Sequence, residues 1–556
     1  MRTTARFNKV FVWVVGILFL GGIELYSQGP AALSGVVSSQ EEGQMEGVLV
    51  SVKREGGNIT VSVVSDNQGR YSFPSDRLQP GNYHLKTRAP GYDLDNPGVV
   101  KLEAGKTAQI NLRLQKTKDL AAQMTPADWI LSKPELKDRL IDGIKYGQNC
   151  IGCHSLTPIL TSKYPAEAWP AILTRMFQHH SASIFERGQV AVVVDHPHKI
   201  LRLKPNGECC LDYQDLGRFI ASVNLSSRPD GTWPFELKTV PRPKGRGTKV
   251  ILTEYEVPRR QAQPHDVIVD KKGMLWYNDH GNQYISRLNP KTGEIQEWLV
   301  PGVTADRAAG GSSGRPALDK EGNLWFGNVK VDIETAALTV GKGRTAADGG
   351  IWRERGSEQA DGNPRVNELI RLDPRTDEAR RYPGPNRPMS FYGSEVDSQG
   401  NFYGASLDYG LVAIMNGKSG EWAFVDAPST AKNGTSAGPR RTTLDGQERF
   451  WYAQYFSGGI GMFDPKAWQI KEWPLYPYAL PYGIGVAKSG EAWAAGQGTD
   501  YVYRLNPSTG EVTTYWKGSV VYGQSRHLYV DSSTTPATVW IGHNHMASVV
   551  KIEPLD

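Results

Sequence analysis

The sequence predicts a mainly β protein: a small β-sandwich, then a short α-helical domain, then a C-terminal β-propeller. Three observations predict this architecture. Short alternating strands separated by turn residues fill 33–115, a CxxCH motif lies between two helical patterns in 116–228, and a unit with one aromatic anchor recurs through 249–556. Residues 229–248, rich in proline and basic residues, form a predicted linker.

Composition excludes several classes of protein. The 556 residues are 39% hydrophobic and 22% charged, which excludes general disorder and requires more than one hydrophobic core. The net charge of +5 is small for a chain of this length, so we expect no nucleic-acid partner. Only four cysteines occur, too few for a disulfide framework.

The first 27 residues have the pattern of a signal peptide or an uncleaved membrane anchor. A basic start, MRTTARFNK, precedes the apolar run VFVWVVGILFLGGIELY. This run is shorter than the ~20 residues that a spanning helix needs. We therefore expect a periplasmic or secreted protein that contacts a membrane only if this segment is retained.

Residues 33–115 contain the strands GVLVSVKR, ITVSVVS and YHLKTRA, separated by the turn sequences DNQG and QPGN. The pattern predicts an antiparallel sandwich. Through SDNQGRYSF and LQPGNYHLKTRAPGY the segment resembles the carboxypeptidase regulatory-like, transthyretin-like domain. The resemblance implies a binding or spacer module without a catalytic residue, and we interpret it as a spacer.

Two helical patterns flank the next motif. Residues 116–145 have apolar residues at helical spacing, with Ser132 as the expected N-cap and Pro134 in the first turn. DLGRFIASV at 215–223 has the same periodicity. The chain between these two patterns carries CIGCH.

Cys150, Cys153 and His154 form CxxCH, which predicts covalently attached haem c. Two thiols add to the haem vinyl groups and the adjacent histidine binds iron axially. A zinc half-site and a thiol redox pair are the alternatives, but the other thiols, Cys209 and Cys210, are adjacent and cannot form a second CxxC. Those two cysteines are either a vicinal disulfide or two free thiols.

The segment 146–227 resembles a monohaem cytochrome c domain through YGQNCIGCHSL and the closing DLGRFIASVNLSS. A second axial ligand is needed. Met176 is the only methionine between His154 and Trp233, and we favour it as that ligand. His179 and His180 are the alternatives, as a bis-histidine site.

From residue 249 each unit has an inner strand, a DxxG-type turn, a strand with an aromatic anchor and an N/D-P-x-T-G hairpin. The period is that of propeller blades. Trp352 divides the one long gap between anchors, so we predict seven blades, with six as the alternative. KVILTEYEVP is expected to supply the outer strand of the last blade. The anchors are Trp276, Trp325, Phe402, Trp451, Trp493 and Trp540.

Residues 249–556 resemble the streptogramin B lyase family, also called virginiamycin B lyase, through the DxxGxLW turn and the DPxTGxxxxW hairpin. The family opens a cyclic ester by elimination, using a divalent metal with His and Glu donors at the channel mouth. The resemblance implies His265 and Asp279 as candidate catalytic residues, with Asp in place of Glu. Arg526 stands where a second His is expected, which disfavours the metal.

Aligning the units on their anchors predicts which side chains converge at one mouth of the channel. Arginines, histidines and amides there indicate a small anionic or carbonyl-bearing ligand, unless these groups only bond neighbouring blades. His543 and His545 form either a metal pair or two solvated loop histidines. The inner-strand positions are His265, Gly314, Phe391, Arg440, Tyr482 and Arg526, and His543 joins them from the post-anchor position.

These patterns together predict an exported c-type haem protein that couples electron transfer to a ligand-binding propeller and exchanges electrons with a redox partner protein. A streptogramin-lyase-like C–O lyase with an accessory cytochrome is one alternative. A quinoprotein-type dehydrogenase is another, although no calcium-binding carboxylate cluster is evident in the sequence.

Overall fold

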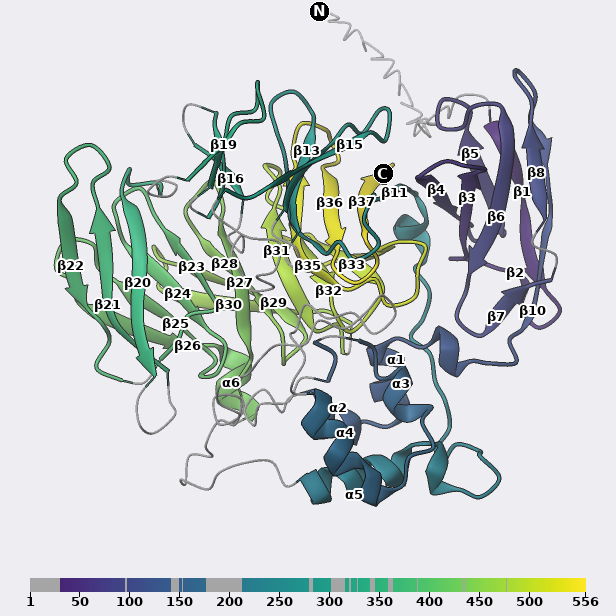
Figure 1. Cartoon of the computed structure of the whole chain (residues 1–556), viewed down its shortest axis with the longest axis horizontal. Helices are drawn as coiled ribbons and strands as arrows, with labels where there is room; N and C mark the ends of the chain where they lie inside the picture. Colours follow the sequence, from purple (N-terminus) through teal and green to yellow (C-terminus); the bar gives the residue numbers. More distant parts are fainter. Residues whose placement is uncertain are drawn as a thin grey trace, which may run out of the picture.

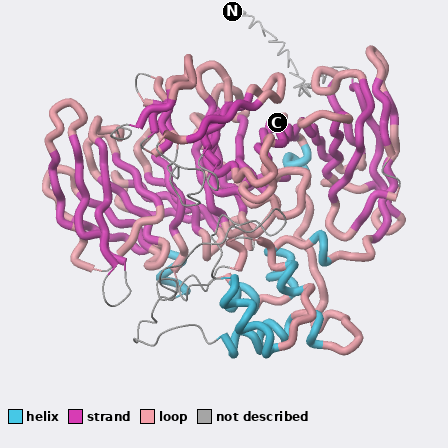
Figure 2. Tube along the Cα trace, in the orientation of Figure 1, coloured by secondary structure: helices cyan, strands magenta, loops and turns pink. Residues whose placement is uncertain are grey.

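The computed structural model is mainly β, with its helices gathered at one end of the molecule (Figures 1 and 2). The structure does not describe every residue of the chain. Outside the described residues lie the predicted leader 1–27 and Cys153, His179, His180, Cys209 and Cys210. Among the described residues, no helix is long and apolar enough to cross a membrane. The structure describes residues 31–95, 98–141, 150–152, 154–176, 213–279, 284–301, 316–319, 322–327, 329–340, 346–358, 364–387, 389–433, 436–476 and 478–556.

The N-terminal sandwich packs two sheets around a core that includes Leu33, Val50, Phe73 and Leu85. These side chains alternate with exposed ones along their strands, which is the pattern of a sheet with one buried face. One sheet holds β1 (Ala31–Ser39), β2 (Gly43–Gln44), β5 (Arg70–Pro74), β7 (Tyr92–Leu94), β9 (Ala108–Gln109) and β10 (Leu112–Lys116). The other holds β3 (Leu49–Arg54), β4 (Ile59–Val64), β6 (Gly81–Arg88) and β8 (Val99–Leu102).

Short helices follow the sandwich. Thr125, not Ser132, caps the first helix: its side chain accepts from the Asp128 N–H, and the Asp128 carboxylate accepts from the Thr125 N–H in return. Ser132 is the last residue of that helix, because Pro134 prevents its continuation. The helices are α1 (Pro126–Ser132), α2 (Glu135–Leu140), α3 (Thr157–Leu160), α4 (Trp169–Met176) and α5 (Tyr213–Val223), with 3₁₀ turns at Ala121–Gln123, Ala166–Ala168 and Leu225–Ser227.

Seven antiparallel sheets succeed one another from residue 250 onward in the described chain, and Trp352 lies in the third, as the anchor spacing predicted. The first and second sheets are β12 (Pro264–Val269), β13 (Leu275–Asp279), β14 (Tyr284–Leu288) and β15 (Ile295–Leu299), and then β16 (Ala317–Leu318), β17 (Leu324–Phe326), β18 (Val329–Val331) and β19 (Leu338–Val340). The third and fourth are β20 (Ile351–Glu358), β21 (Pro364–Leu372) and β22 (Ala379–Pro383), and then β23 (Gly393–Val396), β24 (Phe402–Ser406), β25 (Leu411–Met415) and β26 (Trp422–Asp426). The fifth and sixth are β27 (Pro439–Leu444), β28 (Phe450–Gln454), β29 (Gly459–Asp464) and β30 (Gln469–Pro474), and then β31 (Pro481–Val486), β32 (Ala492–Gly496), β33 (Tyr501–Leu505) and β34 (Val512–Trp516). The seventh is β35 (Ser525–Asp531), β36 (Thr538–His543), β37 (Ser548–Pro554) and β11 (Val250–Glu256).

The recurring DxxGxLW pattern has a physical basis. In the first sheet the Trp276 indole donates to the Asp270 carboxylate at 2.7 Å. The equivalent pairs in the second and fifth sheets, Trp325 with Asp319 and Trp451 with Asp445, are 2.8 Å apart. The aspartate thus closes the turn and satisfies the indole N–H of the aromatic anchor, because a buried N–H needs a partner.

The inner strands of five sheets contact one another in the order β12, β35, β31, β27, β23. The first sheet packs its fully buried Trp276 against Leu324 and Phe326 of the second. The third sheet shares a cluster with the fourth through Leu369 and Phe402. This succession of meanders with inner strands side by side is a propeller fold.

Strand β11 pairs with β37 from Val250 opposite Pro554 to Glu256 opposite Ser548, as the sequence predicted. The other edge of β11 pairs with β4 of the sandwich, which the sequence did not indicate. One eight-stranded sheet therefore runs from the propeller into the sandwich, and Figure 1 shows these strands side by side. The sandwich is thus joined to the propeller by backbone hydrogen bonds, although the helical segment and the linker separate them along the chain.

The helical segment also packs against the propeller. Its apolar core includes Leu407, Tyr455 and Leu480, which come from propeller loops. The Ala127 N–H at the start of α1 donates to the Gly498 carbonyl at 2.8 Å. The helices are therefore held against one end of the propeller, which brings the CxxCH motif to that end.

Candidate functional site

The CxxCH loop rests on the propeller through its backbone carbonyls. The Ile151 carbonyl accepts from the Tyr522 hydroxyl at 2.7 Å and from Gln524 Nε2 at 2.6 Å. The Gly152 carbonyl accepts from Arg526 Nη2 at 2.7 Å. All three donors belong to β35 or to the loop before it. The inner strand of the seventh sheet thus positions the predicted haem motif.

The described residues of the motif lie close together around this contact. His154 Nδ1 is 2.7 Å from the Ser155 carbonyl, and because a carbonyl only accepts, that nitrogen carries the proton. The Nε2 lone pair then points away from this bond and is the nitrogen that a metal would use. Cys150 is half-buried and its N–H donates to the Leu140 carbonyl at 2.9 Å. Met176 is half-buried at the end of α4.

Next to this contact lies a group of aromatic and cationic side chains, which we call the mouth cluster: His265, Tyr392, Arg440, Arg441, Tyr482 and Arg526. His265, Arg440, Tyr482 and Arg526 are buried, Arg441 is half-buried, and Tyr392 is 38% exposed. The Tyr482 ring is central, and its hydroxyl is hydrogen-bonded to that of Tyr392. Guanidinium carbons lie 3.9, 5.2 and 5.8 Å from the Tyr482 ring centroid, those of Arg440, Arg526 and Arg441 respectively. Four residues predicted for the mouth therefore come together.

The electrostatics of the mouth cluster are dominated by the three guanidiniums. Burial alone would raise the pKa of the Tyr482 phenol, but the positive charges of Arg440, Arg526 and Arg441 outweigh burial and hold that pKa well below its ordinary value. Arg440 is 4% exposed, and its Nε and Nη1 have no hydrogen-bond partner among the described residues. Buried, unpaired guanidinium N–H groups are suited to bind an anionic oxygen.

The sequence alignment missed two members of the mouth cluster, Tyr392 and Arg441, because it assumed that side chains alternate strictly between the two faces of each strand. In the fourth sheet the ring of Phe391 packs on Phe402 and Trp422, and its neighbour Tyr392 takes the mouth position instead. In the fifth sheet both the buried Arg440 and the half-buried Arg441 face the Tyr482 ring. An irregularity in strand register between Pro439 and Thr442 explains the second case, because a bulge turns consecutive side chains to one side. The inner strands β12, β31 and β35 also have a shift in pairing register at the end that lies near the mouth.

The candidate catalytic pair has other partners. The Asp279 carboxylate is 2.7 Å from the Arg259 guanidinium and accepts from the Gln263 N–H at 2.9 Å. His265 Nδ1 is 2.8 Å from Asp266 Oδ2. In the part of the chain that the structure describes, no group of three or more His, Cys, Asp or Glu comes together to hold a metal ion. The residues of the lyase hypothesis are thus held by protein groups.

His543 and His545 are both buried, at 0% and 2% exposure, so the alternative of two solvated loop histidines is wrong. His543 Nδ1 is 3.2 Å from the Ser548 hydroxyl and 3.8 Å from the Glu254 carboxylate. Its partners therefore lie on β37 and β11. His545 follows β36, and its ring stands 6.1 Å from that of Tyr522.

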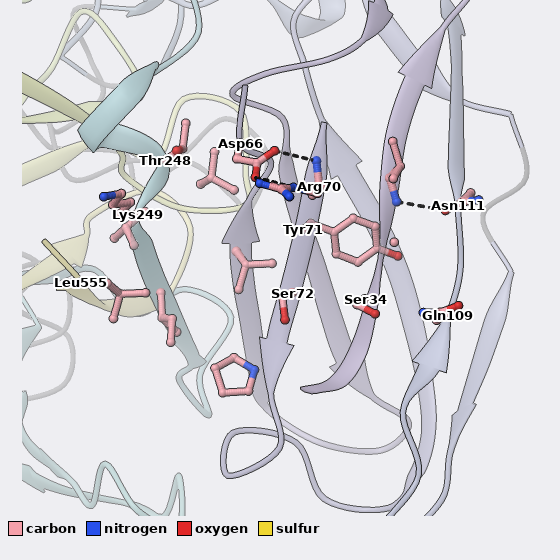
Figure 3. Close-up of a pocket in the computed structure, with 17 residues that line it drawn as sticks. Ser34, Asp66, Arg70, Tyr71, Ser72, Gln109, Asn111, Thr248, Lys249 and Leu555 are labelled. Atoms are coloured by element: carbon pink, nitrogen blue, oxygen red, sulfur yellow. Dashed lines mark hydrogen bonds and ion pairs between the residues drawn. The ribbon is translucent and has the colours of Figure 1, made fainter. Parts of the chain in front are cut away.

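Hollows also lie elsewhere among the described residues. One, of about 550 Å³, is bounded by inner strands of six sheets at their ends away from the mouth, and Ile268, Trp352 and Tyr529 are among its lining residues. Another, of about 800 Å³, lies between the sandwich and the propeller (Figure 3). There the Arg70 guanidinium donates to Asp66 at 2.9 Å, so these two charges satisfy each other. We assign neither hollow a function.

Comparisons with known proteins agree with the sandwich and the propeller. Residues 32–115 match the family model of the carboxypeptidase regulatory-like domain, which confirms that prediction. A search of the curated proteins gives no match. Virginiamycin B lyase from Staphylococcus aureus is a similar solved structure, with 17% identity, a TM-score of 0.42, and coverage of 55% of this chain and 99% of that chain.

Two further solved structures are similar at the same level. A streptogramin B lyase has 16% identity and a TM-score of 0.43, with 56% of this chain and 99% of that chain covered. The β-propeller domain of Myceliophteria thermophila Cps50 (Swd1) has 9% identity and a TM-score of 0.40, with 55% and 100% covered. Residues 32–115 are thus similar in sequence to the carboxypeptidase regulatory-like family.

Proposed function

We propose that this chain is an exported c-type haem protein in which a covalent haem on the helical segment exchanges electrons with a redox partner protein, next to a propeller mouth that binds a small anionic or carbonyl-bearing ligand. The observation that carries the proposal is the seating of the CxxCH loop on Tyr522, Gln524 and Arg526. Export follows from the leader sequence, and membrane contact is proposed only for a retained leader.

The residues of the CxxCH motif fit a haem. A c-type haem needs two thiols, which the sequence supplies as Cys150 and Cys153, and a histidine that would bind iron through Nε2. His154 meets the second requirement, because its Nδ1–H is bound to the Ser155 carbonyl. When bound, the haem supplies one-electron transfer.

The protein's own groups set the surroundings of that haem. Ile151 within the motif and Leu156 just after it are fully buried in the apolar core of the helical segment, and they would help to exclude water from a haem bound there. Arg526 bridges the two parts of the site, since it donates to the Gly152 carbonyl and also stacks on Tyr482. A ligand in the mouth would therefore lie near the haem-bearing loop, and we propose that its binding and electron transfer are coupled.

A direct test is the presence of covalent haem. The full chain, co-expressed with a cytochrome c maturation system, should retain haem peroxidase staining after denaturing electrophoresis and show the mass of one added haem. Cys150→Ser/Cys153→Ser should lose both signals because neither thioether can form. Wild-type protein without haem, or staining that survives in the double variant, would refute the proposal.

A further inference from the structure

His545 is a buried imidazole with an unusual lack of partners. It is 2% exposed, and neither ring nitrogen has a hydrogen-bond partner among the described residues. Leaving such a polar group buried without a partner costs free energy. A buried imidazole in this state is therefore suited to a ligand that donates to it or to a metal that it binds.

The surroundings of His545 connect it to the CxxCH loop. Its ring centroid is 6.1 Å from that of Tyr522, whose hydroxyl donates to the Ile151 carbonyl. The neighbouring Asn544 N–H donates to the Gln524 carbonyl at 2.7 Å, and Gln524 in turn donates to Ile151. Two of the residues that hold the loop thus also contact this segment: Tyr522 contacts the ring of His545, and Gln524 bonds the backbone of the neighbouring Asn544.

We infer that His545 of the propeller is the second axial ligand of the haem iron, opposite His154 of the helical segment. This inference rests on the proposed function and replaces the earlier expectation of Met176. A thioether ligand raises a haem's reduction potential, so two imidazoles give a lower potential than a His/Met pair. The iron would also join the helical segment to the propeller.

Spectroscopy of the oxidised full chain tests the inference. Wild type should be low-spin without the near-infrared sulfur-to-iron band of a methionine ligand. His545→Ala should become high-spin and return to low-spin when imidazole is added. His545→Met should acquire the sulfur-to-iron band, which a purely structural role would not produce. His543→Gln is the matched control, because that histidine is equally buried but faces Glu254 and Ser548, and it should keep the wild-type spectrum.

Failure of the inference and failure of the proposed function give different results. No covalent haem in wild type overturns the proposed function and the inference with it. Covalent haem with a sulfur-to-iron band in wild type that Met176→Ala removes overturns only the inference. So does a low-spin spectrum that persists in His545→Ala but is lost in His179→Ala/His180→Ala. Haem content, measured after pyridine treatment, must match wild type in each variant compared.

Discussion

Acid should weaken the seventh sheet through Glu254, a buried carboxylate on β11. One carboxylate oxygen accepts from the Ser548 hydroxyl at 2.9 Å, and the other accepts from the Ser519 hydroxyl at 2.6 Å. His543 lies 3.8 Å away. Burial would raise the pKa of Glu254, but these hydrogen bonds and the charge of His543 outweigh it and lower the pKa from 4.5 to about 2. Glu254 therefore stabilises the pairing of β11 with β37 in its charged form.

The sign and size of the effect follow from this shift. Because the folded pKa is lower than the unfolded one, the stabilisation is fully present above pH 4.5 and is lost as the pH falls toward about 2. The shift corresponds to about 3 kcal/mol. Glu254→Gln keeps the shape and one acceptor oxygen but cannot ionise. It should lower the free energy of unfolding by up to about 3 kcal/mol at neutral pH, and by little near pH 2.

Urea denaturation of the propeller, followed by circular dichroism at a series of pH values, measures this difference. Glu256→Gln is the control on the same strand, since Glu256 is exposed and pairs with Lys53 at the surface. That change should cost less than about 1 kcal/mol at any pH. A Glu254→Gln deficit that stays constant between neutral and acid pH, or that equals the Glu256→Gln deficit, would refute the reasoning.

Two further predictions concern the mouth. Arg526→Ala should raise the rate of amide hydrogen exchange in 150–156 by tenfold or more, because a charged hydrogen bond contributes about 1.5–3 kcal/mol. An unchanged exchange rate would contradict docking of the loop through the Gly152 carbonyl. Arg526→Lys should retain part of the protection. Arg440→Ala should weaken binding of acetate, measured by calorimetry, by about tenfold. Equal acetate affinity in Arg440→Ala and wild type would remove the mouth cluster as the anion site.

The repeated part of the fold was predictable because it depends on local chemistry. A DxxG turn followed by Trp fixes one hairpin whatever surrounds it, since the Asp and the indole bond each other within six residues, as Asp270 and Trp276 do. The outer strand at 249–258 was predictable because its pattern matches those of the other units. The pairing of β11 with β4 was not, because two strands almost two hundred residues apart carry no common signal of their meeting.

The site was predictable in part, for the same reason. Arg440 and Tyr482 were found by alignment to the anchors, and Arg526 by alignment of the last unit on its VD pair. Tyr392 was not found, because it precedes β23 and the strand's alternation does not place it. Arg441 was not found, because the register irregularity between Pro439 and Thr442 breaks the period of two on which the alignment depends. Most of the docking of the CxxCH loop uses backbone carbonyls of Ile151 and Gly152, and a carbonyl has no sequence signature.

The placement of the CxxCH loop has a consequence for how the two proposed activities affect each other. Oxidation of a haem adds one positive charge, and an anion in the mouth adds a negative one, so each favours the other. The coupling free energy is reciprocal. If the oxidised form binds the anion more tightly than the reduced form, then binding of the anion must lower the reduction potential by the corresponding amount. Arg526 touches both the loop and Tyr482, and the surrounding side chains exclude the water that would screen these charges. The propeller mouth is therefore suited to control electron transfer by binding a ligand without performing any chemistry on it.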